Sequence, residues 1–196
     1  MELIAHRINT IRELAELSPE YGVELDLRDG IDGRIYIQHE PFLSGEDFEA
    51  YLKNYHHGRL IANIKSERIE WQARALLQQY GVENYFFLDS TFPMIKLLTE
   101  EGEKNIALRY SEFEGMDTLE AMAGKVDWVW VDCFTCFPLT KPDYDKMKAM
   151  GYKICIVSPE LEGQPEKITA YRDLIKKRGI HPEAVCTKVY QMKKWR

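Results

Sequence analysis

The sequence lacks the features that mark exported, membrane-spanning and nucleic-acid-binding proteins. Its N-terminus, MELIAHRINT, has neither the basic segment nor the apolar segment of a signal peptide. No apolar run approaches the ~18 residues of a membrane span. Positive charge is not in excess, because 26 Lys and Arg face 32 Asp and Glu, a formal net charge of −6. Such a balance argues against nonspecific binding to nucleic acid. We therefore expect a cytoplasmic protein with no membrane span and no nucleic-acid partner.

Cysteine is scarce, and its positions do not suggest a disulfide framework. Cys155 and Cys186 lie inside apolar runs and are expected to be buried thiols. Cys133 and Cys136 form a lone CxxC, with no second pair to complete a zinc site and no thioredoxin-like context. The phenylalanines interleaved with that pair are better explained as a hydrophobic lip than as part of a metal or redox centre.

The chain also lacks internal repeats, linkers and low-complexity segments. Its 196 residues, 45% hydrophobic and 30% charged, suffice for one globular domain with one core but not for two ordinary ones. We expect a single domain over residues 1–196. Its oligomeric state is left open.

Short apolar runs alternate with longer amphipathic ones along the whole chain, and several of the latter end just before a glycine. The expected strands are Glu2–His6, Val23–Leu27, Leu60–Lys65, Tyr85–Asp89, Ile106–Tyr110, Trp128–Asp132, Lys153–Ser158 and Ala184–Val189. The expected helices are Thr10–Leu17, Gly45–Asn54, Arg68–Tyr80, Pro93–Glu101, Asp117–Ala123, Pro142–Met150 and Glu166–Arg178. This alternation predicts an α/β fold, a small (β/α)8 TIM barrel. A doubly wound sheet fits less well, because no Gly-rich phosphate loop follows the first strand.

Two carboxylates share one face of the second expected strand. Side chains alternate across a strand, so Glu24 and Asp26 point to the side opposite Val23, Leu25 and Leu27. Adjacent inward carboxylates repel one another, and burial opposes their charge. A hard divalent cation would compensate them, and a buried ion pair with lysine or arginine is the open alternative.

Polar residues also stand near the ends of other expected strands. On the third strand Asn63 and Lys65 share the inward face, and Lys65 is placed to contact a phosphate or a carboxylate. The later strands end near Asp89, Arg109, Asp132 and Lys188. An active site at the carboxyl ends of barrel strands requires such a concentration of polar groups.

Two histidines stand at the ends of strand-like segments. His6 ends the first expected strand. His39 ends the alternating run Arg34–His39, which follows the strong turn signal Asp32-Gly33 and predicts a short extra strand. Since histidine exchanges protons near neutral pH, His6 and His39 form a candidate acid–base pair.

The stretches IAHRINTIREL and GVELDLRDGIDGRIYIQHEPF resemble the glycerophosphodiester phosphodiesterase family. The shared features are a His-Arg pair, an Asn-Thr pair, Glu-x-Asp, an Asp-Gly turn and a histidine followed by an acid. Here they read His6-Arg7, Asn9-Thr10, Glu24 with Asp26, Asp32-Gly33, and His39-Glu40. The family's Pro-Glu before Asn-Thr is missing. The family's Glu-x-Lys or Asp-x-Lys on the third strand is here Asn63-Ile-Lys65, which predicts a cation that is either weakly held or held with help from Asp89 or Asp132.

The resemblance implies a metal-dependent phosphodiesterase acting on a small glycerophosphodiester-like molecule. Ca²⁺ or Mg²⁺ would be held by Glu24, Asp26 and Asn63, and His6 and His39 would be the acid and base. The expected substrate-binding cations are Arg7, Lys65, Arg109 and Lys188. A catalytically weak barrel that binds a phosphorylated ligand is the alternative. A metal-independent enzyme like the bacterial phosphatidylinositol phospholipases C is a third hypothesis, which retention of Glu24 and Asp26 disfavours.

Overall fold

The computed structural model describes residues 1–196, and the chain divides into two compact units. The first unit is Ile4–Glu100. The second joins Met1–Leu3 to Glu101–Arg196. The boundary at Glu100 coincides with the end of the fourth α-helix of the chain.

The first unit is built on parallel strands with a small antiparallel extension. Strand β2 pairs in parallel with β1 on one side and β5 on the other, and β5 continues in parallel to β6. Strand β3 pairs antiparallel with β2, and β4 pairs antiparallel with β3. The bounds are Glu2–Ala5 for β1, Gly22–Asp29 for β2, Ile35–Ile37 for β3, Glu46–Asp47 for β4, Leu60–Ile64 for β5 and Tyr85–Leu88 for β6. In this register Asp26 lies opposite Asn63, so the two polar residues are neighbours across the sheet.

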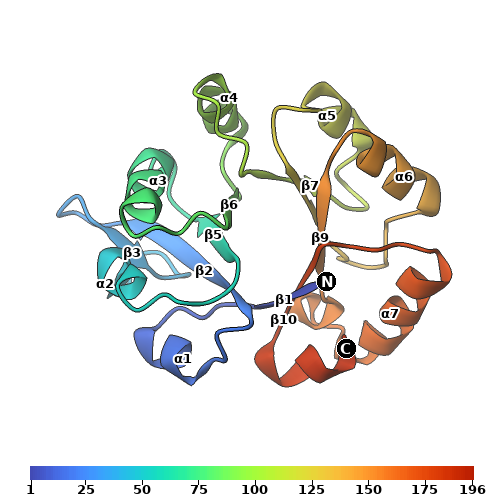
Figure 1. Ribbon diagram of the computed structural model, residues 1–196, viewed down its shortest axis with the longest axis horizontal. Coiled ribbons are helices and arrows are strands. Elements are labelled where there is room, and N and C mark those ends of the chain that lie inside the picture. The colour runs from blue at the N-terminus through green and yellow to red at the C-terminus, as the bar shows by residue number, and fades with distance from the viewer. The chain divides into compact units, whose positions relative to one another are not determined.

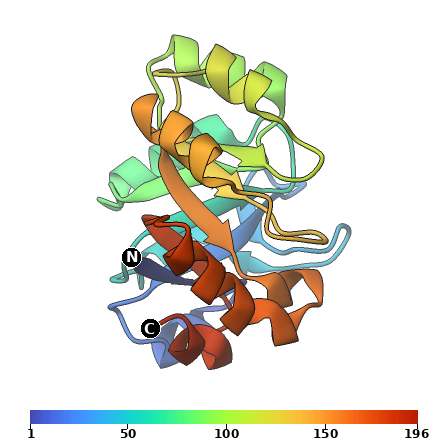
Figure 2. The ribbon, with the colours of Figure 1, turned by 90° about the vertical axis from the view of Figure 1, so that its right-hand side faces the viewer.

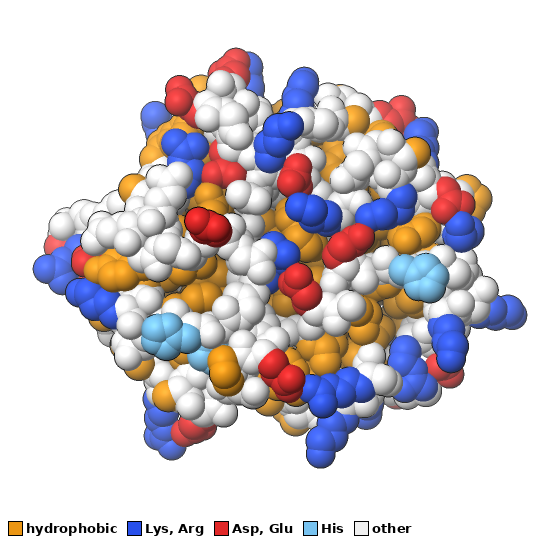
Figure 3. All heavy atoms as spheres, in the orientation of Figure 1, with side chains coloured by type: hydrophobic (Ala, Val, Ile, Leu, Met, Phe, Trp, Pro, Cys, Tyr) orange, Lys and Arg blue, Asp and Glu red, His pale blue; other side chains and the backbone are white.

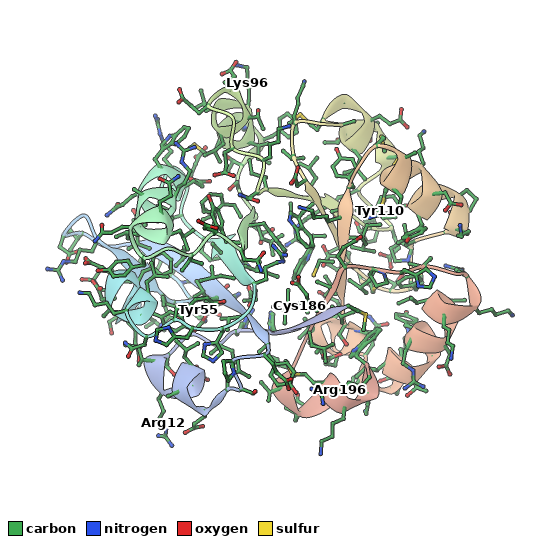
Figure 4. The ribbon with its side chains drawn as sticks, in the orientation of Figure 1. Arg12, Tyr55, Lys96, Tyr110, Cys186 and Arg196 are labelled. Atoms are coloured by element: carbon green, nitrogen blue, oxygen red, sulfur yellow. The ribbon has the colours of Figure 1, made fainter.

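Four helices follow the strands of this unit (Figure 1). They are α1 (Ile11–Glu16), α2 (Phe48–Leu52), α3 (Glu70–Gln79) and α4 (Phe92–Glu100). Thr10 and Glu13 form a capping box at the start of α1, and Asp47 caps α2. Tyr55, labelled in Figure 4, follows α2 and donates its hydroxyl to the Gly58 carbonyl over 2.8 Å. The two caps satisfy backbone N–H groups at the starts of these short helices.

The second unit repeats the parallel strand-and-helix pattern. Strands β7, β8, β9 and β10 pair in that order, each parallel to the next. Their bounds are Ala107–Tyr110, Trp128–Val131, Lys153–Val157 and Ala184–Thr187. The α-helices are α5 (Met116–Ala121), α6 (Lys141–Ala149) and α7 (Ile168–Lys177), seen with their strands in Figure 2. Three 3₁₀ helices complete it, at Pro159–Glu162, Pro165–Lys167 and Val189–Lys194.

The eight expected strands and seven expected helices are all present, with ends shifted by a few residues. The short strand expected over residues 34–39 is β3. The helix expected from Gly45 begins at Phe48, because Glu46 and Asp47 form β4 instead. Cys155 and Cys186 are buried, as expected. None of the helices has both the length and the hydropathy that a transmembrane span requires.

Candidate active site

Glu24 and Asp26 lie at the centre of a polar cluster within the first unit. Both are buried, with 1% and 0% of their surface exposed. Each oxygen of Glu24 accepts a hydrogen bond, one from the Arg7 backbone N–H at 2.8 Å and one from Asn63 Nδ2 at 2.9 Å. Burial and, second, the Asp26 carboxylate raise the pKa of Glu24 to about 7 against these hydrogen bonds. Burial and mutual repulsion thus oppose two full negative charges on this pair, and a further cation beside it would offset that opposition.

The two carboxylate oxygens of Asp26 differ in their hydrogen bonding: Oδ2 accepts a hydrogen bond and Oδ1 accepts none. Asn9 forms two hydrogen bonds with Asp26: its Nδ2 donates to Oδ2 over 2.9 Å, and its Oδ1 accepts from the Asp26 backbone N–H over 3.1 Å. Asp26 Oδ1 is buried with no hydrogen-bond donor, and the ammonium of Lys65 is 3.7 Å away. Lys65 also donates to Asp89 Oδ2 over 3.3 Å. The alternative of a carboxylate paired with a lysine is thus present in part.

Asn63 presents its two amide atoms differently. Its Nδ2 holds Glu24, whereas its Oδ1 is buried and has no hydrogen-bond donor. An unsatisfied buried oxygen is costly, and a hard cation is one partner that would relieve the cost. The two buried oxygens without a donor, Asn63 Oδ1 and Asp26 Oδ1, belong to residues that lie opposite each other on β5 and β2, next to Glu24. This donor set fits a Ca²⁺- or Mg²⁺-type ion, although no group of three His, Cys, Asp or Glu side chains converges on one point.

The two candidate catalytic histidines contact the same cluster. His6 follows β1, and its Nε2 lies 3.7 Å from Glu24 Oε2. His39 follows β3, with Nδ1 2.7 Å from Glu40 Oε1 and Nε2 2.5 Å from Arg7 Nη2. Because Glu40 accepts and Arg7 donates, the hydrogen-bond network assigns the proton of neutral His39 to Nδ1. The bond from His39 lowers the pKa of the Glu40 carboxyl.

Arg7 connects most of these groups. Its backbone N–H donates to Glu24, its guanidinium contacts His39, and its Nε lies 3.9 Å from Asp26 Oδ2. Its φ of 55° is left-handed, as is the φ of 62° at Asp89. Such backbone is costly for residues with a side chain and tends to occur at functional sites. Arg7 remains 42% exposed, so its guanidinium is open to an incoming anion.

The remaining predicted cations lie in the second unit. Arg109, on β7, pairs with the buried carboxylate of Asp132, just after β8. Lys188 follows β10, and its backbone N–H donates to Glu160 Oε1 over 3.0 Å. Their role as substrate-binding groups stays a prediction.

No protein-family model matches the chain, and no curated protein sequence matches it significantly. Solved structures do match. A glycerophosphodiester phosphodiesterase from Agrobacterium tumefaciens has a TM-score of 0.67 at 13% identity, with 96% of this chain and 97% of that chain covered. The Thermotoga maritima glycerophosphodiester phosphodiesterase has a TM-score of 0.60 at 17% identity. The match covers 99% of this chain and 97% of that chain. An Oleispira antarctica phosphodiesterase in complex with the product sn-glycerol-3-phosphate has a TM-score of 0.63 at 14% identity. The match covers 95% of this chain and 92% of that chain.

This chain has the fold of glycerophosphodiester phosphodiesterases. The α/β TIM-barrel class predicted from the sequence is confirmed, and so is the resemblance at the level of the fold. The match covers nearly the whole length of these neighbours.

Two residues that sequence reasoning missed support the cluster. Tyr51 of α2 is fully buried and donates its hydroxyl to the Ile8 carbonyl over 2.8 Å, fixing the segment after His6. Arg28 of β2 donates to the His39 carbonyl over 2.7 and 3.1 Å and to the Lys65 carbonyl over 3.1 Å. Neither carries a sequence signal of its role, since both act through backbone atoms that come close only after folding.

Proposed function

We propose that the protein is a metal-dependent phosphodiesterase that cleaves a glycerophosphodiester-like substrate with His6 and His39 as its acid–base pair. The observation that carries the proposal is that one arginine, Arg7, contacts both the Glu24–Asp26 pair and His39, while His6 lies beside Glu24. The two histidines are thereby linked to a single cluster of charges. The fold of the solved phosphodiesterases supports this assignment.

The substrate phosphate would be bound by cationic side chains at the edge of the cluster. The exposed guanidinium of Arg7 and the ammonium of Lys65 would contact its non-bridging oxygens. A divalent cation held by Glu24, Asp26 and Asn63 would supply further positive charge there. Stabilising the charge that accumulates on phosphorus-bound oxygens is usually the largest catalytic contribution.

Proton transfer falls to the histidines. One accepts the proton of the attacking hydroxyl, from the substrate itself or from water, as its oxygen bonds to phosphorus. The other protonates the alkoxide as its P–O bond breaks. Glu40 orients His39 through Nδ1, so that Nε2 faces the reaction. Since Arg7 now occupies that nitrogen, a bound phosphate would draw the guanidinium away and leave Nε2 open to proton transfer.

We expect hydrolysis of bis(p-nitrophenyl) phosphate that requires Mg²⁺ or Ca²⁺ and is lost on addition of EDTA. His6→Ala and His39→Ala should each reduce kcat by about a hundredfold or more, because general acid–base catalysis contributes on that order. His56→Ala is the matched control, since His56 is exposed in the loop after α2 and should keep full activity.

Activity that survives chelation would favour the metal-independent phospholipase type. Hydrolysis unchanged in both His6→Ala and His39→Ala would refute the catalytic assignment.

The contact between Arg7 and His39 also favours a second function, a catalytically weak barrel that binds a phosphorylated ligand. While the Arg7 guanidinium occupies His39 Nε2, that nitrogen cannot accept a proton from a nucleophile, but the guanidinium can still bind an anion. Calorimetric binding of glycerol 3-phosphate by a folded protein without diesterase activity would support this function over the enzyme.

A further inference from the structure

A cavity of about 680 Å³ lies in the first unit, beside the segment that carries His39. One wall is the turn between β2 and β3, with Gly30 and Ile31. The other is the loop after His39, with Phe42 and Leu43. The site described above leaves this cavity without a role.

The cavity carries an unusual amount of exposed apolar surface. Ile31 and Phe42 are fully exposed and Leu43 is 62% exposed. Hydrophobic side chains reach the surface at the left edge of Figure 3, where Figure 1 places the β2–β3 turn. Single exposed apolar residues are ordinary, but three around one cavity mark a binding surface. Phe42 also has a left-handed φ of 64°, a cost that no packing of its ring offsets.

Two glycines allow the walls of the cavity to approach β3 closely. A Cβ at Gly45 would lie 2.1 Å from the Ile37 carbonyl oxygen, and one at Gly30 would lie 2.4 Å from the Tyr36 ring. Only glycine permits these approaches. At these two glycines the loop and the turn lie directly against residues of β3.

The cavity adjoins the candidate active site. Gln38 and Pro41, which flank His39 and Glu40, line it, and so does Ser66, which follows Lys65. A second cavity of about 480 Å³, lined by Arg7 and Asn9, shares with it the wall formed by Gln38, Ser44 and Gly45.

Its charges exclude a second anion. Arg28 is the one cationic side chain of the lining, and its guanidinium already donates to the carbonyls of His39 and Lys65. Asp29 and Asp32 add negative charge. The cavity therefore disfavours a phosphate, whereas its exposed apolar side chains suit an apolar chain.

Resting on the function proposed above, we propose that this cavity binds an alkyl or acyl arm of the phosphodiester, while the phosphate lies beside Arg7. The preferred substrates are then diesters that bear an aliphatic chain. The chain contacts Phe42, Leu43 and Ile31.

Binding is tested by calorimetry with octyl phosphate and methyl phosphate, both below micellar concentrations. Octyl phosphate should bind at least about tenfold more tightly, because each buried methylene contributes. In the variant carrying Phe42→Ser and Leu43→Ser the ratio should fall to within about twofold. Phe113→Ser is the matched control, an aromatic that is 77% exposed in the second unit, and it should keep the wild-type ratio.

Activity supplies an independent measurement, the ratio of kcat/KM for p-nitrophenyl octyl phosphate to that for p-nitrophenyl methyl phosphate. A chain preference in binding without any hydrolysis would uphold the cavity and refute the enzyme. Hydrolysis with equal ratios in wild type and variant would uphold the enzyme and overturn the cavity. The protein could instead sediment with phosphatidylcholine–phosphatidylglycerol vesicles in a Phe42-dependent way and show no preference for octyl phosphate. That result would also overturn the cavity proposal, because it would assign the surface to bilayer binding.

Discussion

Asn63 stands where the family pattern has a carboxylate, and its two amide atoms have opposite effects on the cluster. Nδ2 stabilises ionised Glu24 by donating a hydrogen bond, whereas Oδ1 lacks a donor. The amide thus limits the negative charge of a buried cluster that holds Glu24 and Asp26. It also limits the attraction for a cation.

Asn63→Asp should therefore change stability and cation binding in opposite directions. Without a divalent cation the variant loses a donor and gains a third carboxylate, and its free energy of unfolding should fall by about 2 kcal/mol. With Mg²⁺ or Ca²⁺ the added charged oxygen should tighten binding by about tenfold. Calorimetric titration and thermal unfolding with and without the ion measure the two effects.

Asn84→Asp provides the control, since Asn84 is exposed in the loop before β6 and should change neither quantity. Cation binding unchanged or weaker in Asn63→Asp would discard the ligand role of Asn63. The amide would then act only as a hydrogen-bond donor to Glu24.

At the residue scale, alternation along β2 was enough to predict that Glu24 and Asp26 share a face. Asn63 followed from the same reasoning, because β5 pairs in parallel with β2. The contact between Arg7 and His39 was not predictable. It depends on the left-handed backbone at Arg7 and on the path of the loop after β3, and no local pattern encodes either.

At the scale of elements, one carboxylate from the loop after β7 binds the backbone amides of the loop after β8. Glu112 Oε1 accepts hydrogen bonds from Thr135 N at 2.6 Å, Thr135 Oγ1 at 3.0 Å and Cys136 N at 2.7 Å. Partial burial opposes ionisation, but these donors prevail and lower the pKa of Glu112 to about 2. Gln164 Nε2 also donates to the Phe134 carbonyl over 2.7 Å and Lys167 Nζ to the Thr135 carbonyl over 2.9 Å, so the CxxC segment is held by hydrogen bonds on both its amides and its carbonyls.

The Glu112 contact should persist in acid and fail only at very low pH. A lowered folded-state pKa means that the stabilisation is complete above the ordinary value near 4.5, declines as pH falls, and is lost below about 2. Glu112→Gln should remove it at all pH values. Amide hydrogen exchange at Thr135 and Cys136, measured by NMR from pH 2 to 6, checks this.

In the wild type, exchange at these two amides, corrected for its intrinsic pH dependence, should stay slow to about pH 3. Glu120→Gln, at an exposed residue of α5, should behave as the wild type. Equal protection in Glu112→Gln would show that the loop is held by other contacts.

Elements with a clear local signal were predicted, the three-residue strand β3 among them, whereas the two-residue strand β4 was missed. The strands have apolar runs and several helices end before glycine, which are local signals. Strand β4 has only Glu46 and Asp47, and it forms because Tyr36 and Ile37 offer a partner edge. Its existence depends on a tertiary contact, so the sequence pattern around Gly45 indicated only the helix that follows.

At the scale of the whole molecule, the fold was predictable because eight strand-and-helix units leave few alternatives. The number of cooperative units was harder to predict. The chain divides into Ile4–Glu100 and the remainder, and β1 itself is split, with Glu2 and Leu3 in one unit and Ile4 and Ala5 in the other. The single domain over residues 1–196 stays a prediction.

We expect one unfolding transition for the whole chain. Because β1 is a continuous strand whose residues belong to both units, opening either unit would disrupt a strand of the other. Pulse-labelling hydrogen exchange with mass spectrometry, at increasing guanidinium concentration, reads each unit separately. Peptides from β2 and β5 should lose protection at the same midpoint as peptides from β8 and β9, and circular dichroism should give that midpoint as well. Two separated midpoints would mean that the units fold independently, and the single-domain organisation would be wrong.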